Sequence, residues 1–94
     1  MGAKELILNI AVNLNRISRF AMEGKVKRVK QFVDENDEYI KEVDKLKLSD
    51  KFNSTFERFK KDIVELKNKK VFDEMWSEEM LTWANILEHR AKLA

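Results

Sequence analysis

Apolar residues recur along this chain at alternating steps of three and four positions, which is the spacing of helix faces that pack against other helices. The pattern is widest in the first segment, residues 3–22. Its main seam is Ala3, Ile7, Ile10, Leu14, Ile17 and Ala21, and Leu6, Leu8, Val12 and Phe20 broaden it. A stripe this wide contacts two neighbours, so we expect this segment to be the most buried helix.

The apolar face changes direction near Gly24. Extending the first seam beyond Ala21 would place Gly24, Arg28 and Gln31 in the core, whereas a second seam runs through Met22, Val26, Val29, Val33, Ile40 and Val43. Glycine adopts the left-handed conformation that commonly ends a helix, so the sequence predicts a break there. The alternative is one long helix over residues 3–48 in a three-helix chain that dimerises. Lys25, Lys27 and Arg28 favour it, because cations are unfavourable in the first turn of a helix.

Two further helices follow a turn at residues 48–50. Ser49 or Asp50 is a suitable N-cap for a helix over residues 50–66, whose seam is Phe52, Phe56, Phe59, Ile63 and Leu66. The cation-rich residues 67–70 predict its end. Asp73 and Glu74 favour the start of a last helix, which carries Phe72, Trp76, Met80, Trp83, Leu87 and Ala91 on one face.

Four helices joined by short turns predict an all-α fold, an up-and-down antiparallel four-helix bundle formed by one domain over residues 1–94. The chain has no proline, two glycines and 44% hydrophobic residues, which excludes intrinsic disorder. It has no cysteine and no apolar run long enough to span a membrane. We therefore expect a cytoplasmic protein.

No pattern of catalytic, metal-binding or cofactor-binding residues is present. His89 is the only histidine, and Ile86 occupies the place of the glutamate in a Glu-x-x-His metal motif. Two glycines cannot form a glycine-rich phosphate loop. The sequence therefore predicts a protein that is not an enzyme and binds no metal or cofactor.

Charge alternates in sign along the chain. Residues 1–32 carry seven basic and two acidic side chains, residues 33–50 three and seven, residues 51–70 seven and three, and residues 71–94 two and five. The favoured interpretation is complementarity between neighbouring helices, which selects partners more than it stabilises the fold. The alternative is phosphate binding in a nucleic-acid-associated protein, through basic patches that comprise Lys25, Lys27, Arg28, Lys30, Lys60, Lys61, Lys67, Lys69 and Lys70.

Two polar or aromatic features lie on the predicted apolar faces. Asn36 falls on the seam between Val33 and Ile40, where a polar side chain can fix register. Trp76 and Trp83 share one face, which indicates core packing or an interface.

Apolar residues such as Val64, Leu81 and Leu93 lie off the predicted seams, so the chain has more apolar positions than its core needs. This excess is most consistent with protein–protein interaction by an adaptor, regulator or inhibitor that we expect to self-associate as a homodimer; another protein is the alternative partner. Tryptophan is enriched at the energetic centres of interfaces. The candidate partner interface is Trp76, Met80, Leu81 and Trp83.

Overall fold

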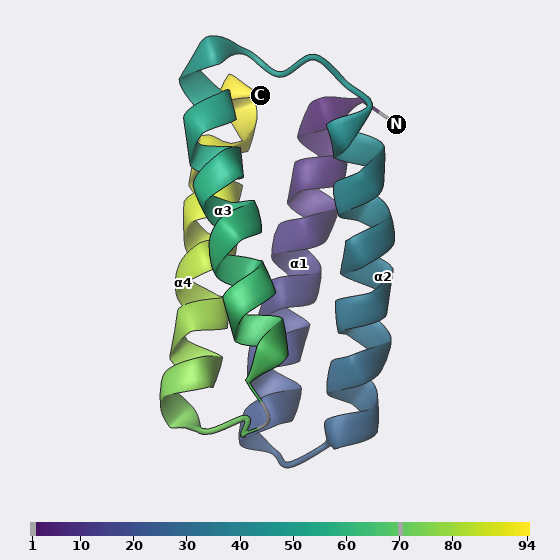
Figure 1. The fold of residues 1–94 in the computed structure, drawn as a ribbon, viewed down its shortest axis with the longest axis vertical. Helices are drawn as coiled ribbons and strands as arrows, with labels where there is room; N and C mark the ends of the chain where they lie inside the picture. The colour runs from purple at the N-terminus through teal and green to yellow at the C-terminus, as the bar shows by residue number, and fades with distance from the viewer. Residues whose placement is uncertain (1, 70) are drawn as a thin grey trace.

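The computed structural model describes residues 2–69 and 71–94, and all regular secondary structure within them is helical (Figure 1). Four α-helices run up and down in turn: α1 (Ala3–Met22), α2 (Val26–Asp44), α3 (Asp50–Asn68) and α4 (Glu74–Arg90). A short 3₁₀ turn, η1 (Ala91–Leu93), follows the last helix. The predicted antiparallel four-helix bundle is confirmed.

The break at Gly24 is also confirmed, and the single helix over residues 3–48 is wrong. Gly24 has φ of +74°. The Lys25 amide donates to the Phe20 carbonyl over 2.9 Å, and the Gly24 amide donates to the Ala21 carbonyl over 3.1 Å. This pair of bonds defines a Schellman motif, which satisfies carbonyls that the end of a helix would leave without partners.

Side-chain caps begin the third and fourth helices. The Ser49 hydroxyl accepts from the Phe52 amide over 3.3 Å, and the Asp73 carboxylate accepts from the Trp76 amide over 2.9 Å. Both caps satisfy amides of a first helical turn. No side chain caps α2, whose start is set by the Gly24 turn instead.

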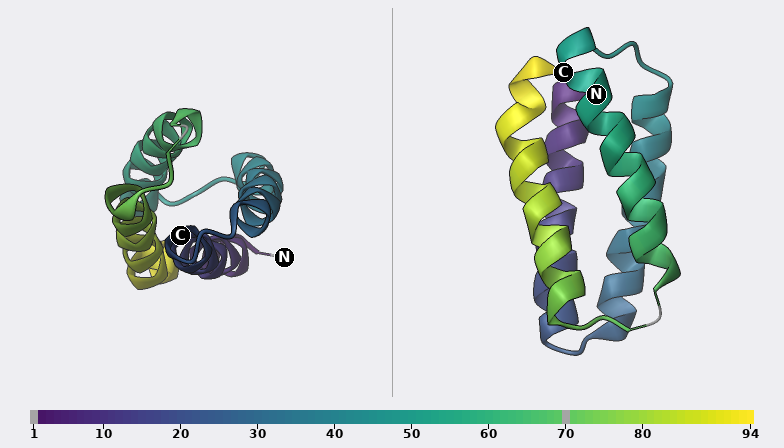
Figure 2. Two further views of the ribbon diagram at one scale, coloured as in Figure 1. Left: turned by 90° about the horizontal axis from the view of Figure 1, so that it is seen from below. Right: turned by 60° about the vertical axis from the view of Figure 1, so that its left-hand side comes forward.

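Seen along its long axis, the bundle places one helix at each corner, with α3 diagonally opposite α1 (Figure 2). The α1 backbone approaches those of α2 and α4 closely, whereas the Cα atoms of α2 and α3 stay more than 8 Å apart. Bulky aromatic side chains of α3 fill the centre, and the rings of Phe56 and Phe59 lie 5.8 Å apart. α1 also contains more buried residues than any other of the four helices, as its wide apolar stripe predicts.

Polar side chains inside the bundle tie α1 to both neighbours. The Ser18 hydroxyl donates to the Ser77 carbonyl of α4 over 2.8 Å. Asn36 is buried, and its amide donates to the Ile10 carbonyl over 3.3 Å, which links α2 to α1 as its seam position indicates. These directional bonds fix the relative height of the three helices.

Candidate functional site

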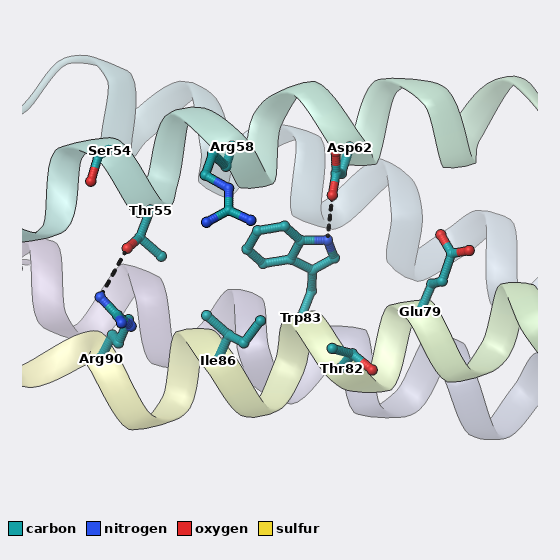
Figure 3. A pocket seen from close by; sticks show the side chains of 9 residues that line it. All are labelled: Ser54, Thr55, Arg58, Asp62, Glu79, Thr82, Trp83, Ile86 and Arg90. Carbon is teal, nitrogen blue, oxygen red and sulfur yellow. Dashed lines mark hydrogen bonds between the residues drawn. The ribbon is translucent and has the colours of Figure 1, made fainter.

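A groove of about 500 Å³ runs between α3 and α4 on the outside of the bundle (Figure 3). Its lining comes from successive turns of the two helices. The residues are Ser54, Thr55, Arg58 and Asp62 of α3 with Glu79, Thr82, Trp83, Ile86 and Arg90 of α4.

Trp83 forms the middle of the groove and is held rigidly. Its indole N–H donates to the Asp62 carboxylate over 3.2 Å. Its ring meets the Phe59 ring edge-on, with centroids 5.5 Å apart. Half-buried Ile86, one turn further along α4, adds an aliphatic surface beside the indole (Figure 3). The centre of the groove is therefore apolar and fixed in conformation.

The two ends of the groove carry opposite charge. Arg58 and Arg90 lie toward one end, and Asp62 and Glu79 lie toward the other (Figure 3). Arg90 donates to the Thr55 hydroxyl over 3.3 Å. None of the four charged side chains forms an ion pair with a described residue, and Arg58 and Glu79 form no hydrogen bond with one either.

The structure separates the four residues of the predicted interface. Trp76 and Met80 are buried, at 2% and 0% exposed, and the Trp76 indole donates to the Leu66 carbonyl over 2.9 Å. Core packing accounts for both residues, and neither offers surface to a partner. Trp83 is 8% exposed and lines the groove. Leu81 is exposed elsewhere, in a shallow depression with Met22 and Arg19 on the α1–α4 side.

Two of the predicted phosphate-binding lysines are engaged in ion pairs between helices. Lys60 lies 2.8 Å from Asp44, and Lys67 lies 2.7 Å from Asp37, so basic α3 is joined to acidic α2. Hydrogen bonds to Asp44 and then to Glu57 raise the pKa of Lys60 above its ordinary value of 10.5. For these two lysines, the complementarity between helices expected from the alternating charge is present.

Five of the remaining basic candidates are exposed and lie at one end of the bundle. Lys25, Lys27, Arg28 and Lys30 lie at the start of α2, and Lys69 follows the end of α3 at the same end of the molecule (Figure 1). Lys25 pairs with Glu23 over 3.1 Å. Lys61 is exposed on the middle of α3, and Lys70 lies outside the described residues.

A metal site and a membrane-spanning helix each have requirements that the described part of the chain does not meet. No group of three or more histidine, aspartate or glutamate side chains there is placed to hold a metal ion. His89 is exposed near the end of α4. Within residues 2–69 and 71–94, no helix has the length and apolar character needed to cross a membrane.

Comparisons with known proteins add no family to this description. The chain matches no family model, and neither a curated protein nor a solved structure matches it.

Sequence reasoning missed most of the groove. Arg58, Asp62, Glu79 and Arg90 are ordinary surface charges in the sequence, and Ile86 flanks the main seam. Helical spacing does contain part of the signal, because Glu79, Thr82, Ile86 and Arg90 share one face of α4. Their meeting with Arg58 and Asp62 depends on how α3 and α4 are aligned, which spacing within one helix does not determine.

Proposed function

We propose that this protein is a protein–protein interaction module that binds its partner through the α3–α4 groove. The observation that supports this most strongly is the combination of a rigid apolar centre with Arg58 and Glu79, two charges that no described residue neutralises. Interfaces commonly surround an aromatic or arginine anchor with a polar rim. Trp83 and Ile86 would supply the centre, and the charged side chains would supply the rim.

The same surface suits a macromolecule better than a small molecule. The groove is open and elongated along two helices, and it includes polar and charged groups at both ends (Figure 3). Small-molecule sites are concave and bury most of the ligand against apolar walls. A helical or extended segment of a protein can instead follow the groove over several turns.

Photo-crosslinking in the source cells tests this proposal. A photo-reactive amino acid at Thr82, in the groove, should form a covalent protein adduct. The same amino acid at Val12, which is 47% exposed on α1, is the control and should form none. Adducts from Val12 alone, or from neither position, would contradict an interaction through the groove.

A second function is favoured by the clustering of basic residues at one end of the bundle. Lys27, Arg28 and Lys30 lie in the first turns of α2, and Lys69 follows the end of α3 at the same end of the bundle, where they could contact phosphates of a nucleic acid. Such binding would weaken by orders of magnitude between roughly 50 and 200 mM salt, because each phosphate contact releases counterions. Replacing these four residues with glutamine should flatten that salt dependence. We rank this function second, because Lys60 and Lys67 are already paired with α2.

A further inference from the structure

We infer that the partner in the α3–α4 groove is a second copy of this chain, bound antiparallel about a twofold axis that crosses the groove midway between Trp83 and Ile86. The inference rests on the proposed interaction function and specifies its partner. A twofold interface must be self-complementary, because the same patch is used on both subunits. The groove meets this condition in its charges and in the order of its residues.

The charge order along the groove reverses sign at its centre. Arg90 and Arg58 lie on one side of the Trp83 ring, and Glu79 lies on the other (Figure 3). A copy turned end to end would therefore place its basic half over the acidic half of the first copy. Opposite potentials across an interface favour the right orientation and suppress wrong ones.

The register of α4 supports the same centre. Glu79 and Arg90 are equally distant from a point between Ala84 and Asn85, which is about 8 Å along the helix from each at 1.5 Å per residue. Antiparallel pairing about that point places Glu79 opposite the partner's Arg90, and Arg90 opposite the partner's Glu79. It also places Trp83 opposite the partner's Ile86, so that the apolar centres meet.

The register of α3 gives an independent second pair. Arg58 and Asp62 are equally distant from Lys60, so the same rotation places Arg58 opposite the partner's Asp62. In Figure 3 the Trp83 ring lies between Arg58 and Asp62 along α3, and also between Arg90 and Glu79 along α4. One axis therefore serves both helices.

The other twofold arrangement is unfavourable. An axis parallel to the helices would set α3 against α4 of the partner with both helices kept at their original heights. Arg58 would then lie near the partner's Arg90, and the acidic ends would lie together in the same way. Juxtaposed like charges exclude such pairings, so the antiparallel arrangement is the self-complementary one.

Charge reversal at Glu79 and Arg90 tests this geometry. Glu79→Arg would place two arginines together at both symmetric contacts, and Arg90→Glu would place two glutamates together. The dissociation constant of the homodimer should rise by about tenfold or more in each variant alone. Mixed together, the two variants should form a one-to-one heterodimer, because every contact is again between opposite charges. Sedimentation equilibrium measures the masses against the 11.2 kDa chain.

Matched controls separate the groove from general charge effects. Glu78→Arg makes the same change one residue away on α4, and Lys92→Glu makes the opposite change beyond its end; both residues are exposed. Both controls should dimerise as the natural chain does. Arg58→Glu, on the other helix, should weaken dimerisation independently by facing the partner's Asp62. Circular dichroism and thermal unfolding establish that each variant is folded.

The outcomes distinguish this inference from the broader function. A heterodimer formed only from the mixed variants would support the antiparallel pair. A natural chain that stays at 11.2 kDa, or a dimer insensitive to these reversals, would overturn it. If Thr82 crosslinks to a different protein in those cases, the groove still acts as an interaction surface. If Thr82 forms no protein adduct, the proposed function fails as well.

Discussion

Trp76 and Trp83 lie two helical turns apart on one face of α4, yet their surroundings differ. Trp76 is enclosed between the end of α3 and Phe72, and its ring centroid lies 4.4 Å from that of Phe72. Trp83 packs against Phe59 on one side and borders the α3–α4 groove on the other. Trp76 therefore closes the end of the core, whereas Trp83 connects the core to a surface.

The aromatic core of α3 carries the first prediction. Phe56 is 1% exposed and packs between Phe52 and Phe59. Phe56→Ala should lower the free energy of unfolding by about 3–5 kcal/mol, because it removes buried apolar surface and leaves a cavity. Lys61→Ala, on an exposed position of the same helix, should change it by less than about 0.5 kcal/mol. Urea unfolding followed by circular dichroism measures both. Equal, small effects would contradict the central position of Phe56.

At the level of elements, the reversal between α1 and α2 depends on one backbone conformation. Gly24→Ala should destabilise the fold by roughly 1–2 kcal/mol, because a β-carbon is unfavourable at a positive φ. Gly24→Asn should cost less, since asparagine tolerates this region better. Thermal unfolding of the two variants checks the order. A neutral alanine variant would mean that the two helices can continue into each other.

The ion pairs between α2 and α3 predict a dependence of stability on pH. The pKa of Lys60 is raised in the folded protein by Asp44 and Glu57. Its contribution to stability is therefore complete below the unfolded pKa near 10.5 and is lost as pH rises through the folded pKa. The free energy of unfolding should fall more steeply above that pH in the natural chain than in Lys60→Gln. If the free energy of unfolding falls equally in the two proteins between pH 9 and about 11.5, Lys60 is not coupled to Asp44 and Glu57 in this way.

The elements could be predicted from local signals, and the groove could not. The left-handed glycine, the Ser49 cap and the three-four seams each act within a few residues, so spacing and residue type suffice to place the helices. Residues 67 and 68 extend α3 slightly beyond the predicted end at Leu66, because helix ends depend on local competition for hydrogen bonds. Burial of Trp76 but not Leu81 depends on how α4 is rotated toward its neighbours.

At the scale of the whole molecule, the groove exists because α3 and α4 are fixed at one relative height. The bond from Trp76 to the Leu66 carbonyl and the contact of Trp83 with Phe59 set that height. Arg58 and Glu79 lie on opposite sides of Trp83 as a consequence (Figure 3). Weakening this alignment should therefore weaken the interaction even without a change in any lining residue.

Trp76→Phe tests this dependence of the groove on alignment. The variant retains the aromatic ring but removes the indole donor, so the Leu66 carbonyl keeps only its bond from the Lys69 amide. The loss of one buried hydrogen bond should cost about 0.5–1.5 kcal/mol in unfolding free energy. Association through the groove should weaken in the same variant, as measured by sedimentation. Undiminished association in a destabilised Trp76→Phe protein would show that the groove does not depend on this bond.

The central claim is that the α3–α4 groove is the interaction surface, and the two indole N–H resonances test it most directly. The Trp83 indole bonds to Asp62 in the groove, whereas the Trp76 indole bonds to Leu66 in the core. Nuclear magnetic resonance spectra should be recorded from dilute to concentrated protein. The Trp83 indole resonance, with amides of Arg58 and Glu79, should shift while the Trp76 indole stays fixed. Shifts confined to residues 25–30, or to Leu81 and Met22, would place the interaction elsewhere and contradict the account.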